Sequence, residues 1–375
     1  MWCEASLTGF SHMMFYQQAA NERKCPGKIQ GKCFNYFETF SKMVDIHISC
    51  FFAKTSIYMK TKEGICVMLE NYSIHTDLAL EDKERFESDN VEISGVSVEE
   101  VYNHEKEIQI TTVKILTENG AKIMRKPVGT YITMEAPNMA IPDDEYQKEI
   151  AEELAEYLKE VLKLEKKDYT ALVVGLGNRD VTPDALGPHV IEELRVTRHI
   201  IREYGKYAMD EKEAHMVSAI APGVMAQTGM ETSEIVKGIV GEIKPDFVIA
   251  IDALAARNTK RLNRTIQIAD TGINPGSGVG NHRQGITEET LGIPVIAIGV
   301  PTVVDAATIV RDTMESMMTT LDTTDKYEAI NKLIAPHLYG MFVTPKDIDE
   351  TIARLGNLIS EALNLLFTKD KSEEA

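Results

Sequence analysis

Short apolar runs alternate with amphipathic stretches along the second half of the chain, and each pattern predicts one kind of element. Continuous runs rich in Val, Ile, Ala and Leu predict buried strands at residues 171–174, 215–220, 247–251, 265–269 and 294–300. Apolar residues at helical spacing predict helices at 143–164, 185–204, 231–243, 305–321 and 345–367. Strands that alternate with helices are typical of βαβ units. The sequence therefore predicts an α/β fold with a mostly parallel sheet flanked by helices.

A β-rich section precedes these units. Residues 108–116 alternate between apolar and polar positions and are rich in branched side chains, and residues 129–134 supply a partner run. Glu118-Asn-Gly120 predicts a turn between them. We expect this hairpin section either to extend the sheet at an edge or to form a flap. Residues 68–105 before it are polar and acidic.

Residues 1–67 differ in composition from the rest of the chain. They hold all five Cys, the single Trp and 11 of the 25 aromatic residues. Their formal charge is +3, from eight Lys or Arg and five Asp or Glu. Because the whole chain carries −18, residues 68–375 carry −21. We expect a leader with little order or a mis-assigned start, with Met59 and Met68 as alternative starts; a small extra module is the other interpretation. A single domain over 79–368 and a frayed tail over 369–375 complete the predicted organisation.

The totals exclude several function classes. A net charge of −18 argues against general nucleic-acid binding, which needs a basic surface. No run approaches the roughly 18 apolar residues of a membrane span, and the start lacks the pattern of a signal peptide. The five Cys are irregularly spaced, without a disulfide framework or a zinc pattern. We therefore expect a cytoplasmic protein that binds neither membranes nor nucleic acid.

Acidic residues follow several of the predicted strands. Asp184, Asp252, Asp270 and Asp305 all stand after such runs. Because ligand sites of open α/β sheets lie at the carboxyl ends of the strands, these acids can converge on one edge. Two adjacent carboxylates share a proton, so one can activate water while the other donates a proton. The structural alternatives are that Asp184 caps the next helix and that Asp252 forms a salt bridge, for example to Arg257.

Other motifs are weaker. Gly175-Leu-Gly177 after a strand resembles a dinucleotide-binding turn, but Asp180 replaces the third glycine and would repel a pyrophosphate. Asp270-Thr-Gly272 is the tripeptide of pepsin-like proteases, which need two copies in a β fold, and here there is one. Ser277 lacks the context of a nucleophile elbow. The nine His form no metal-binding pattern, so we expect no metal and no organic cofactor.

Longer runs carry a family resemblance. They include Leu172-Val-Val-Gly-Leu-Gly-Asn178, Val181-Thr-Pro-Asp-Ala-Leu-Gly-Pro188, Ala250-Ile-Asp-Ala-Leu-Ala-Ala-Arg257, Pro275-Gly-Ser-Gly-Val-Gly-Asn281 and Leu291-Gly-Ile-Pro-Val-Ile-Ala-Ile-Gly-Val300. In this order they resemble the germination proteases of endospore-forming bacteria over roughly residues 68–368. The head at residues 1–67 is the main departure from the family's pattern.

The resemblance implies an atypical aspartic endopeptidase with a fold akin to the hydrogenase maturation proteases. It implies action in the spore core on small acid-soluble spore proteins during germination, and assembly as a homotetramer. The acids proposed as catalytic in the family map to Asp184 and Asp252, while Asp270 remains a third candidate from its place after a predicted strand. The family is made as a zymogen that removes its own propeptide, here residues 68–78, at a stretch that corresponds to Ser73-Ile-His-Thr-Asp77-Leu78-Ala79.

Two alternatives remain open. One is a non-catalytic protein that binds small spore proteins through its acidic surface. The other is a metal-assisted protease, as in the hydrogenase maturation group, although the chain lacks a pattern of His and Glu ligands.

Overall fold

The computed structural model describes residues 58–61, 64–67, 76–88, 94–163, 168–205, 215–275, 284–319, 338 and 341–368. The chain divides into two compact units, residues 1–73 and 74–375, which are described separately. In the first unit, strands β1 (Tyr58–Thr61) and β2 (Gly64–Val67) form an antiparallel hairpin. Little order was predicted for residues 1–67; outside the hairpin that prediction lies beyond the described residues, as does the predicted frayed tail.

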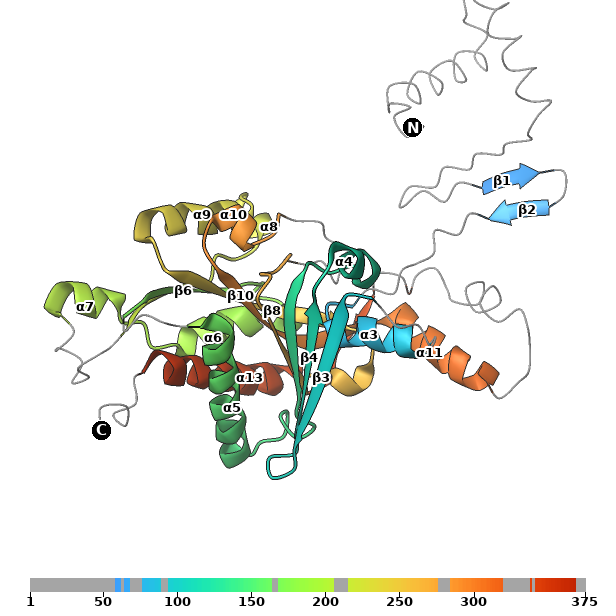
Figure 1. Cartoon of the computed structure of the whole chain (residues 1–375), viewed down its shortest axis with the longest axis horizontal. Coiled ribbons are helices and arrows are strands. Elements are labelled where there is room, and N and C mark those ends of the chain that lie inside the picture. The colour runs from blue at the N-terminus through green and yellow to red at the C-terminus, as the bar shows by residue number, and fades with distance from the viewer. Residues whose placement is uncertain are drawn as a thin grey trace, which may run out of the picture. The chain divides into compact units, whose positions relative to one another are not determined.

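The second unit is built on one mixed sheet, and the predicted α/β class is confirmed (Figure 1). In the described residues the strand order is β3 (Val96–Asn103), β4 (Ile108–Ile115), β5 (Gly129–Glu135), β9 (Thr265–Ala269), β10 (Val295–Asp305), β8 (Phe247–Ala256), β6 (Thr170–Gly175) and β7 (Met216–Ile220). Strands β10, β8, β6 and β7 are parallel, whereas β3, β4, β5 and β9 pair antiparallel. A short strand, β11 (Phe342–Val343), pairs with the end of β10.

The β-rich section extends the sheet, which was one of the two expectations. Strands β4 and β5 pair antiparallel as predicted, but the predicted turn at residues 118–120 is wrong. Helix α4 (Glu118–Met124) forms there instead, because the Thr117 hydroxyl accepts from the Gly120 amide and caps it. Strand β3 carried no sequence signal, since it is an exposed edge strand of polar composition.

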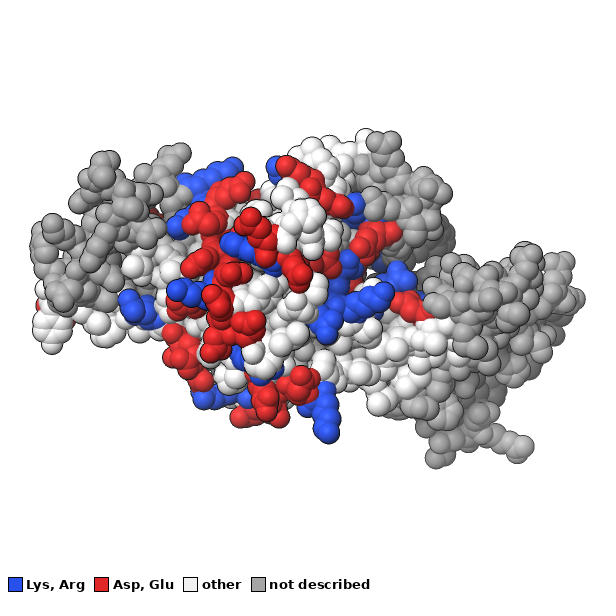
Figure 2. Space-filling model, turned by 90° about the horizontal axis from the view of Figure 1, so that it is seen from below, with Lys and Arg blue, Asp and Glu red and all other residues white. Residues whose placement is uncertain are grey.

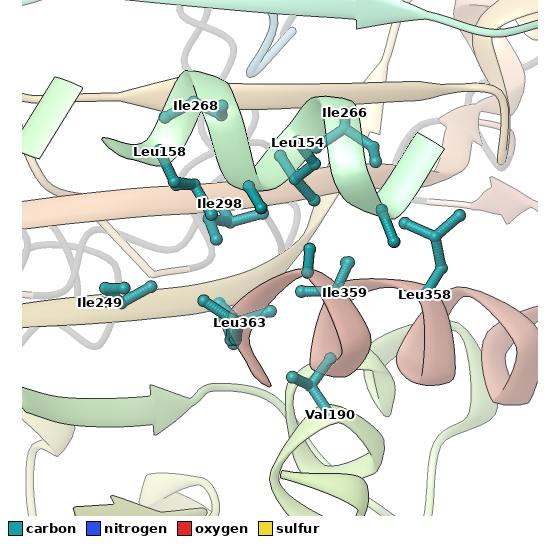
Figure 3. Packing of buried hydrophobic residues seen from close by; sticks show 14 of the residues in the cluster. Leu154, Leu158, Val190, Ile249, Ile266, Ile268, Ile298, Leu358, Ile359 and Leu363 are labelled. Carbon is teal, nitrogen blue, oxygen red and sulfur yellow. The ribbon is translucent and has the colours of Figure 1, made fainter. Parts of the chain in front are cut away.

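Three helices cover one face of the sheet. Helices α5 (Asp144–Leu162), α6 (Leu186–Glu193) and α13 (Ile348–Phe367) pack on each other and on the strands. Figure 3 shows Leu154 and Leu158 of α5 close to Ile266, Ile268 and Ile298 of the sheet, and Leu358, Ile359 and Leu363 of α13 beside Val190 of α6. All belong to one buried cluster, so this layer provides most of the apolar burial that stabilises the unit.

The opposite face carries a second helical layer. Helices α9 (Thr232–Ile243) and α10 (Glu288–Leu291) pack against Val248 and Ala250, whereas Ile249 and Ile251 contribute to the first layer. Since successive side chains of a strand point to opposite faces, the two clusters lie on opposite sides of the sheet. Helices α3 (Ala79–Ser88) and α4 cover β4 and β5. The sequence did not predict α3.

The single helix predicted over 185–204 is wrong. Helix α6 ends at Glu193 and α7 (Arg198–Tyr204) begins afresh, with an extended Leu194 between them. The Thr197 hydroxyl donates to the His215 carbonyl at 2.6 Å and accepts from the Val217 amide at 2.9 Å, which ties the break to β7.

The remaining elements are two short ones, α8 (Met225–Thr228) and the 3₁₀ turn η3 (Thr259–Arg261), and the longer helix α11 (Ala306–Thr319). No helix of the described part of the chain is both long and apolar enough to cross a bilayer.

Candidate active site

The end of strand β6 brings the first two candidate acids to one edge of the sheet. Gly175 pairs with Ile251 of β8, and the Leu176 amide donates to the Ile251 carbonyl at 2.8 Å. Asp252 follows Ile251 directly, so it lies level with the point where β6 gives way to the loop that leads to Asp184. Asp184 and Asp252 therefore both lie near the carboxyl end of β6, and their action as a pair stays a prediction.

Asp184 ends a 3₁₀ turn, η1 (Thr182–Asp184), that sits over this edge. Its carboxylate accepts from the Asn178 amide at 2.8 Å, and the Thr302 hydroxyl of β10 donates to the Pro183 carbonyl at 2.7 Å. The alternative that Asp184 caps the next helix is wrong, because Ala185 is the N-cap of α6 and no side chain caps it. Asp184 is partly exposed, so its carboxylate is open to a substrate or to water.

Gly177 allows the backbone at Asp184 to pack closely against the loop that follows β6. Its φ is +110°, and a Cβ added there would meet the Asp184 carbonyl oxygen at 1.9 Å. We expect Gly177→Ala to lower the free energy of unfolding by about 1–3 kcal/mol through this clash and the strained φ. Urea unfolding measures the change, with Gly241→Ala in α9 as the control, since a Cβ there meets nothing within 4 Å. Equal stability of the two variants would contradict this role of Gly177.

Asp252 is a buried acid inside β8, not at its end, because the strand continues to Ala256. Only 5% of the residue is exposed. The suggested salt bridge with Arg257 is wrong, since the Arg257 guanidinium donates to Asp312 at 3.1 Å. Asp252 pairs with Gly299 of β10, and Gly299 pairs with Gln267 of β9. The three positions therefore form one row across the sheet, facing the layer opposite α5 and α13.

The other two acids have structural partners elsewhere. Because β9 is antiparallel to β10, Asp270 follows the end of β9 that points away from the other acids, and the expected convergence is wrong for it. It is exposed and accepts from the Thr130 amide at 2.7 Å. Asp305 ends β10 and accepts from the Thr308 amide at 2.9 Å in the first turn of α11.

The predicted propeptide cleavage region is bound to the strand that carries Asp252. The Asp77 amide donates to the Ala255 carbonyl at 3.0 Å, and the Asp77 carboxylate accepts from the Ala255 amide at 2.9 Å. Leu78 is fully buried in an apolar pocket that Leu254, Ala256, Leu262 and Val304 line. Residues 77 and 78 thus lie beside β8 only three positions beyond Asp252.

Two side chains hold the peptide group between Asp77 and Leu78. The Lys126 ammonium and the Gln267 amide each donate to the Asp77 carbonyl oxygen, at 3.0 Å in both cases. The Gln267 side-chain oxygen accepts in turn from the Ala79 amide at 2.7 Å. This backbone segment is therefore bound on both sides of one peptide bond.

A buried ionic cluster anchors the chain just after this bond. Glu81 of α3 accepts from the Arg257 amide at 2.7 Å and the Asn258 amide at 2.9 Å, and Arg261 lies within 3.4 Å of it. Arg261 also donates to Glu84 at 2.6 and 2.8 Å and to Glu135 at 2.8 Å. Burial alone would lower the pKa of the Arg261 guanidinium, but its hydrogen bonds to Glu84 and Glu135 raise that pKa above its ordinary value.

The sequence patterns did not mark all residues of this site. Gln267 had a usable signal, because it is the one strongly polar residue in the otherwise β-rich run Thr265–Ala269. Lys126, Glu81 and Arg261 had none, since each becomes significant only through contacts with residues distant in sequence. Among the described residues no group of three His, Cys, Asp or Glu side chains is arranged to hold a metal ion.

Comparison with known proteins decides the family. The family model described as germination protease matches residues 73–320. A germination protease of Caldanaerobacter subterraneus subsp. tengcongensis is 47% identical over 318 residues, covering 80% of this chain and 96% of that protein. The chain belongs to the germination protease family. The family's model therefore spans the candidate acids, the segment at Asp77 and Leu78, and both residues that contact the Asp77 carbonyl.

Other germination proteases extend the match. That of Clostridium tetani is 45% identical over 311 residues, covering 78% of this chain and 95% of the relative. That of Bacillus pumilus is 39% identical over 360 residues, covering 82% and 96%. Among solved structures, a [NiFe] hydrogenase maturation protease from Thermococcus kodakarensis matches with a TM-score of 0.28 at 20% identity, covering 55% of this chain and 98% of that one.

Proposed function

We propose that this germination protease is an endopeptidase of atypical aspartic type that cleaves small acid-soluble spore proteins in the spore core. Asp184 and Asp252 form the catalytic pair. The chain is made as a zymogen that cuts itself between Asp77 and Leu78, one residue before the predicted end of the propeptide at Leu78, and the active protein is a homotetramer. The names of the relatives support a protease of germination, and the placement of both acids at one sheet edge supports the pair.

The observation that carries the proposal is the bound position of residues 76–79. A peptide segment bound along a strand by hydrogen bonds, with a side chain in a pocket, is a common mode of recognition, and here Asp77 makes one backbone and one side-chain hydrogen bond to Ala255. Here the contacts of Asp77 with Ala255 place the segment on β8, and the pocket for Leu78 fixes its direction. The chain thus presents its own peptide bond to the strand that carries Asp252, as a substrate would.

The two acids take different roles because their environments differ. Buried Asp252 is the carboxyl group that more readily holds a proton, since burial disfavours the charged form. Both carboxylates accept from a backbone amide, Asp184 from Asn178 at 2.8 Å and Asp252 from Ala253 at 3.0 Å, but only Asp184 is partly exposed, and access to water favours its ionised form. We assign Asp184 as the base that activates water and Asp252 as the acid that protonates the leaving amine.

The proposal is tested by incubating the purified full-length chain and following the mass and the first residue of each product. We expect cleavage that leaves Leu78 as the new N-terminus, followed by fragmentation of an added small acid-soluble spore protein into discrete peptides. Cleavage at an unrelated bond would refute the processing assignment. An intact substrate in the presence of the processed chain would refute the protease assignment.

A second candidate function follows from the acidic surface. Acidic side chains crowd the face shown in Figure 2, with Lys and Arg between them. Helix α5 alone exposes Asp144, Glu145, Glu152, Glu156 and Glu160. A protein that only binds small spore proteins would retain them at low salt and release them intact at high salt, whereas a protease releases fragments.

A further inference from the structure

Two hydrogen-bond donors converge on a single backbone oxygen beside the candidate site. The Lys126 ammonium and the Gln267 amide lie 3.0 Å from the carbonyl oxygen of Asp77. This oxygen belongs to the peptide bond that the proposed function assigns to self-cleavage, and any catalytic role of its two donors rests on that proposed function. Enzymes that cleave acyl bonds place donors 2.7–3.1 Å from the oxygen that becomes negative in the transition state.

The Gln267 donor is held by the sheet. Gln267 lies in β9, in the same row as Gly299 and Asp252, about 10 Å from Asp252 across two strand spacings. Its side-chain oxygen accepts from the Ala79 amide at 2.7 Å, so its NH₂ group is the part that faces the Asp77 oxygen. One amide side chain therefore fixes the backbone before and after the bond at Asp77 and Leu78.

The Lys126 donor is held by burial and by charge. Its side chain is 14% exposed, and its ammonium lies 3.7 Å from the Asp82 carboxylate of α3. Helix α4 ends at Met124, and its C-cap Arg125, with a left-handed φ of 54°, directly precedes Lys126. A charged donor makes a hydrogen bond roughly twice as strong as a neutral one. A charged donor binds the negative oxygen of the transition state more strongly than the neutral carbonyl oxygen of the ground state, and catalysis requires such a difference in binding energy.

We propose that Lys126 and Gln267 form the oxyanion-stabilising pair of this protease. Water adds to the Asp77 carbonyl carbon and loses a proton to Asp184, while the carbonyl electron pair moves to the oxygen that Lys126 and Gln267 hold. Collapse of this intermediate breaks the bond to the Leu78 nitrogen, which takes a proton from Asp252. The products are the Asp77 carboxyl group and the Leu78 amine, and Lys126 keeps its proton throughout. The same pair receives the carbonyl of a substrate once the segment has left.

The competing role is that Lys126 merely keeps the segment in place. The two roles differ in what they do to the Asp77 amide, which donates to Ala255. Hydrogen exchange of that amide measures the seating of the segment independently of the chemistry. The measurement is made in an Asp252→Asn background, in which the segment stays uncut.

The test compares self-processing rates of full-length variants. We expect Lys126→Met to slow cleavage after Asp77 by about 10²–10³-fold, and Gln267→Met by a similar factor. Lys126→Arg retains the positive donor, and we expect it to recover most of the rate. Lys83→Met is the matched control, because Lys83 is also largely buried, at 12% exposed, and pairs with Glu100 of β3. It should process at the wild-type rate.

Each outcome decides a different point. A slow Lys126→Met variant whose Asp77 amide exchanges as slowly as in the parent supports the oxyanion role. Loss of exchange protection in proportion to the loss of rate would assign Lys126 to anchoring and overturn it. Wild-type processing by both Lys126→Met and Gln267→Met would overturn the oxyanion role but leave the proposed function standing. A wild-type chain that never cuts after Asp77 would overturn both.

Discussion

Asp252→Asn and Asp184→Asn should each abolish self-processing and substrate cleavage, with a loss of at least about 10³-fold in rate. The substitution keeps the shape of each side chain and removes only the group that exchanges protons. The double variant should be no slower than the single ones, because residues that act as a unit are strongly non-additive. The readout is the rate of appearance of a chain that begins at Leu78, measured together with thermal unfolding.

Asp270→Asn is the matched comparison. Asp270 is exposed, and an asparagine oxygen can still accept from the Thr130 amide, so we expect activity close to wild type. If Asp270→Asn were as inactive as Asp252→Asn, the pair would have been assigned wrongly. Full activity in either Asp184→Asn or Asp252→Asn would remove that residue from the mechanism.

Arg261→Met should be strongly destabilising, costing about 3–5 kcal/mol of unfolding free energy. The substitution preserves much of the side-chain volume but removes the cation that Glu81, Glu84 and Glu135 share. Breaking a buried ion pair by removing one partner leaves an uncompensated charge, and buried Glu81 has little access to water. Urea unfolding at neutral pH measures the loss.

Arg264→Met provides the control for the arginine change. Arg264 lies three residues further on and is exposed, so its replacement should alter stability by no more than about 0.5 kcal/mol. Equal effects of Arg261→Met and Arg264→Met would show that the cluster does not anchor the start of the domain.

The sequence predicted the strands and helices whose pattern is determined by burial. The runs at β6, β7 and β8 are continuous because both faces of those strands are covered, and α5 follows its apolar stripe closely. Strand β3 and helix α3 were missed because they are polar, and their formation depends on partners elsewhere in the fold. The direction of β9 was also missed, since an apolar run does not encode whether its neighbour is parallel.

The candidate site was predictable only where an acid interrupts an apolar run. Asp184 and Asp252 stand after or within such a run and lie near the carboxyl end of β6. Asp270 stands after such a run too, but it lies at the opposite edge of the sheet because β9 runs antiparallel to β10. The contacts that join Lys126 and Gln267 to Asp77 span 49 and 190 residues, so no local pattern could signal them. The local sequence does not reveal which side chains, distant along the chain, donate hydrogen bonds to the same carbonyl oxygen.

The tie between Asp77 and Ala255 determines the kinetic order of the proposed processing. Because both residues belong to one folded chain, folding and not collision brings the peptide bond beside β8, the strand that carries Asp252. Well-oriented intramolecular groups react as if present at roughly 10⁵–10⁸ M, far above any concentration of protein in a cell. Processing is then a first-order reaction, and its half-time is independent of the protein concentration.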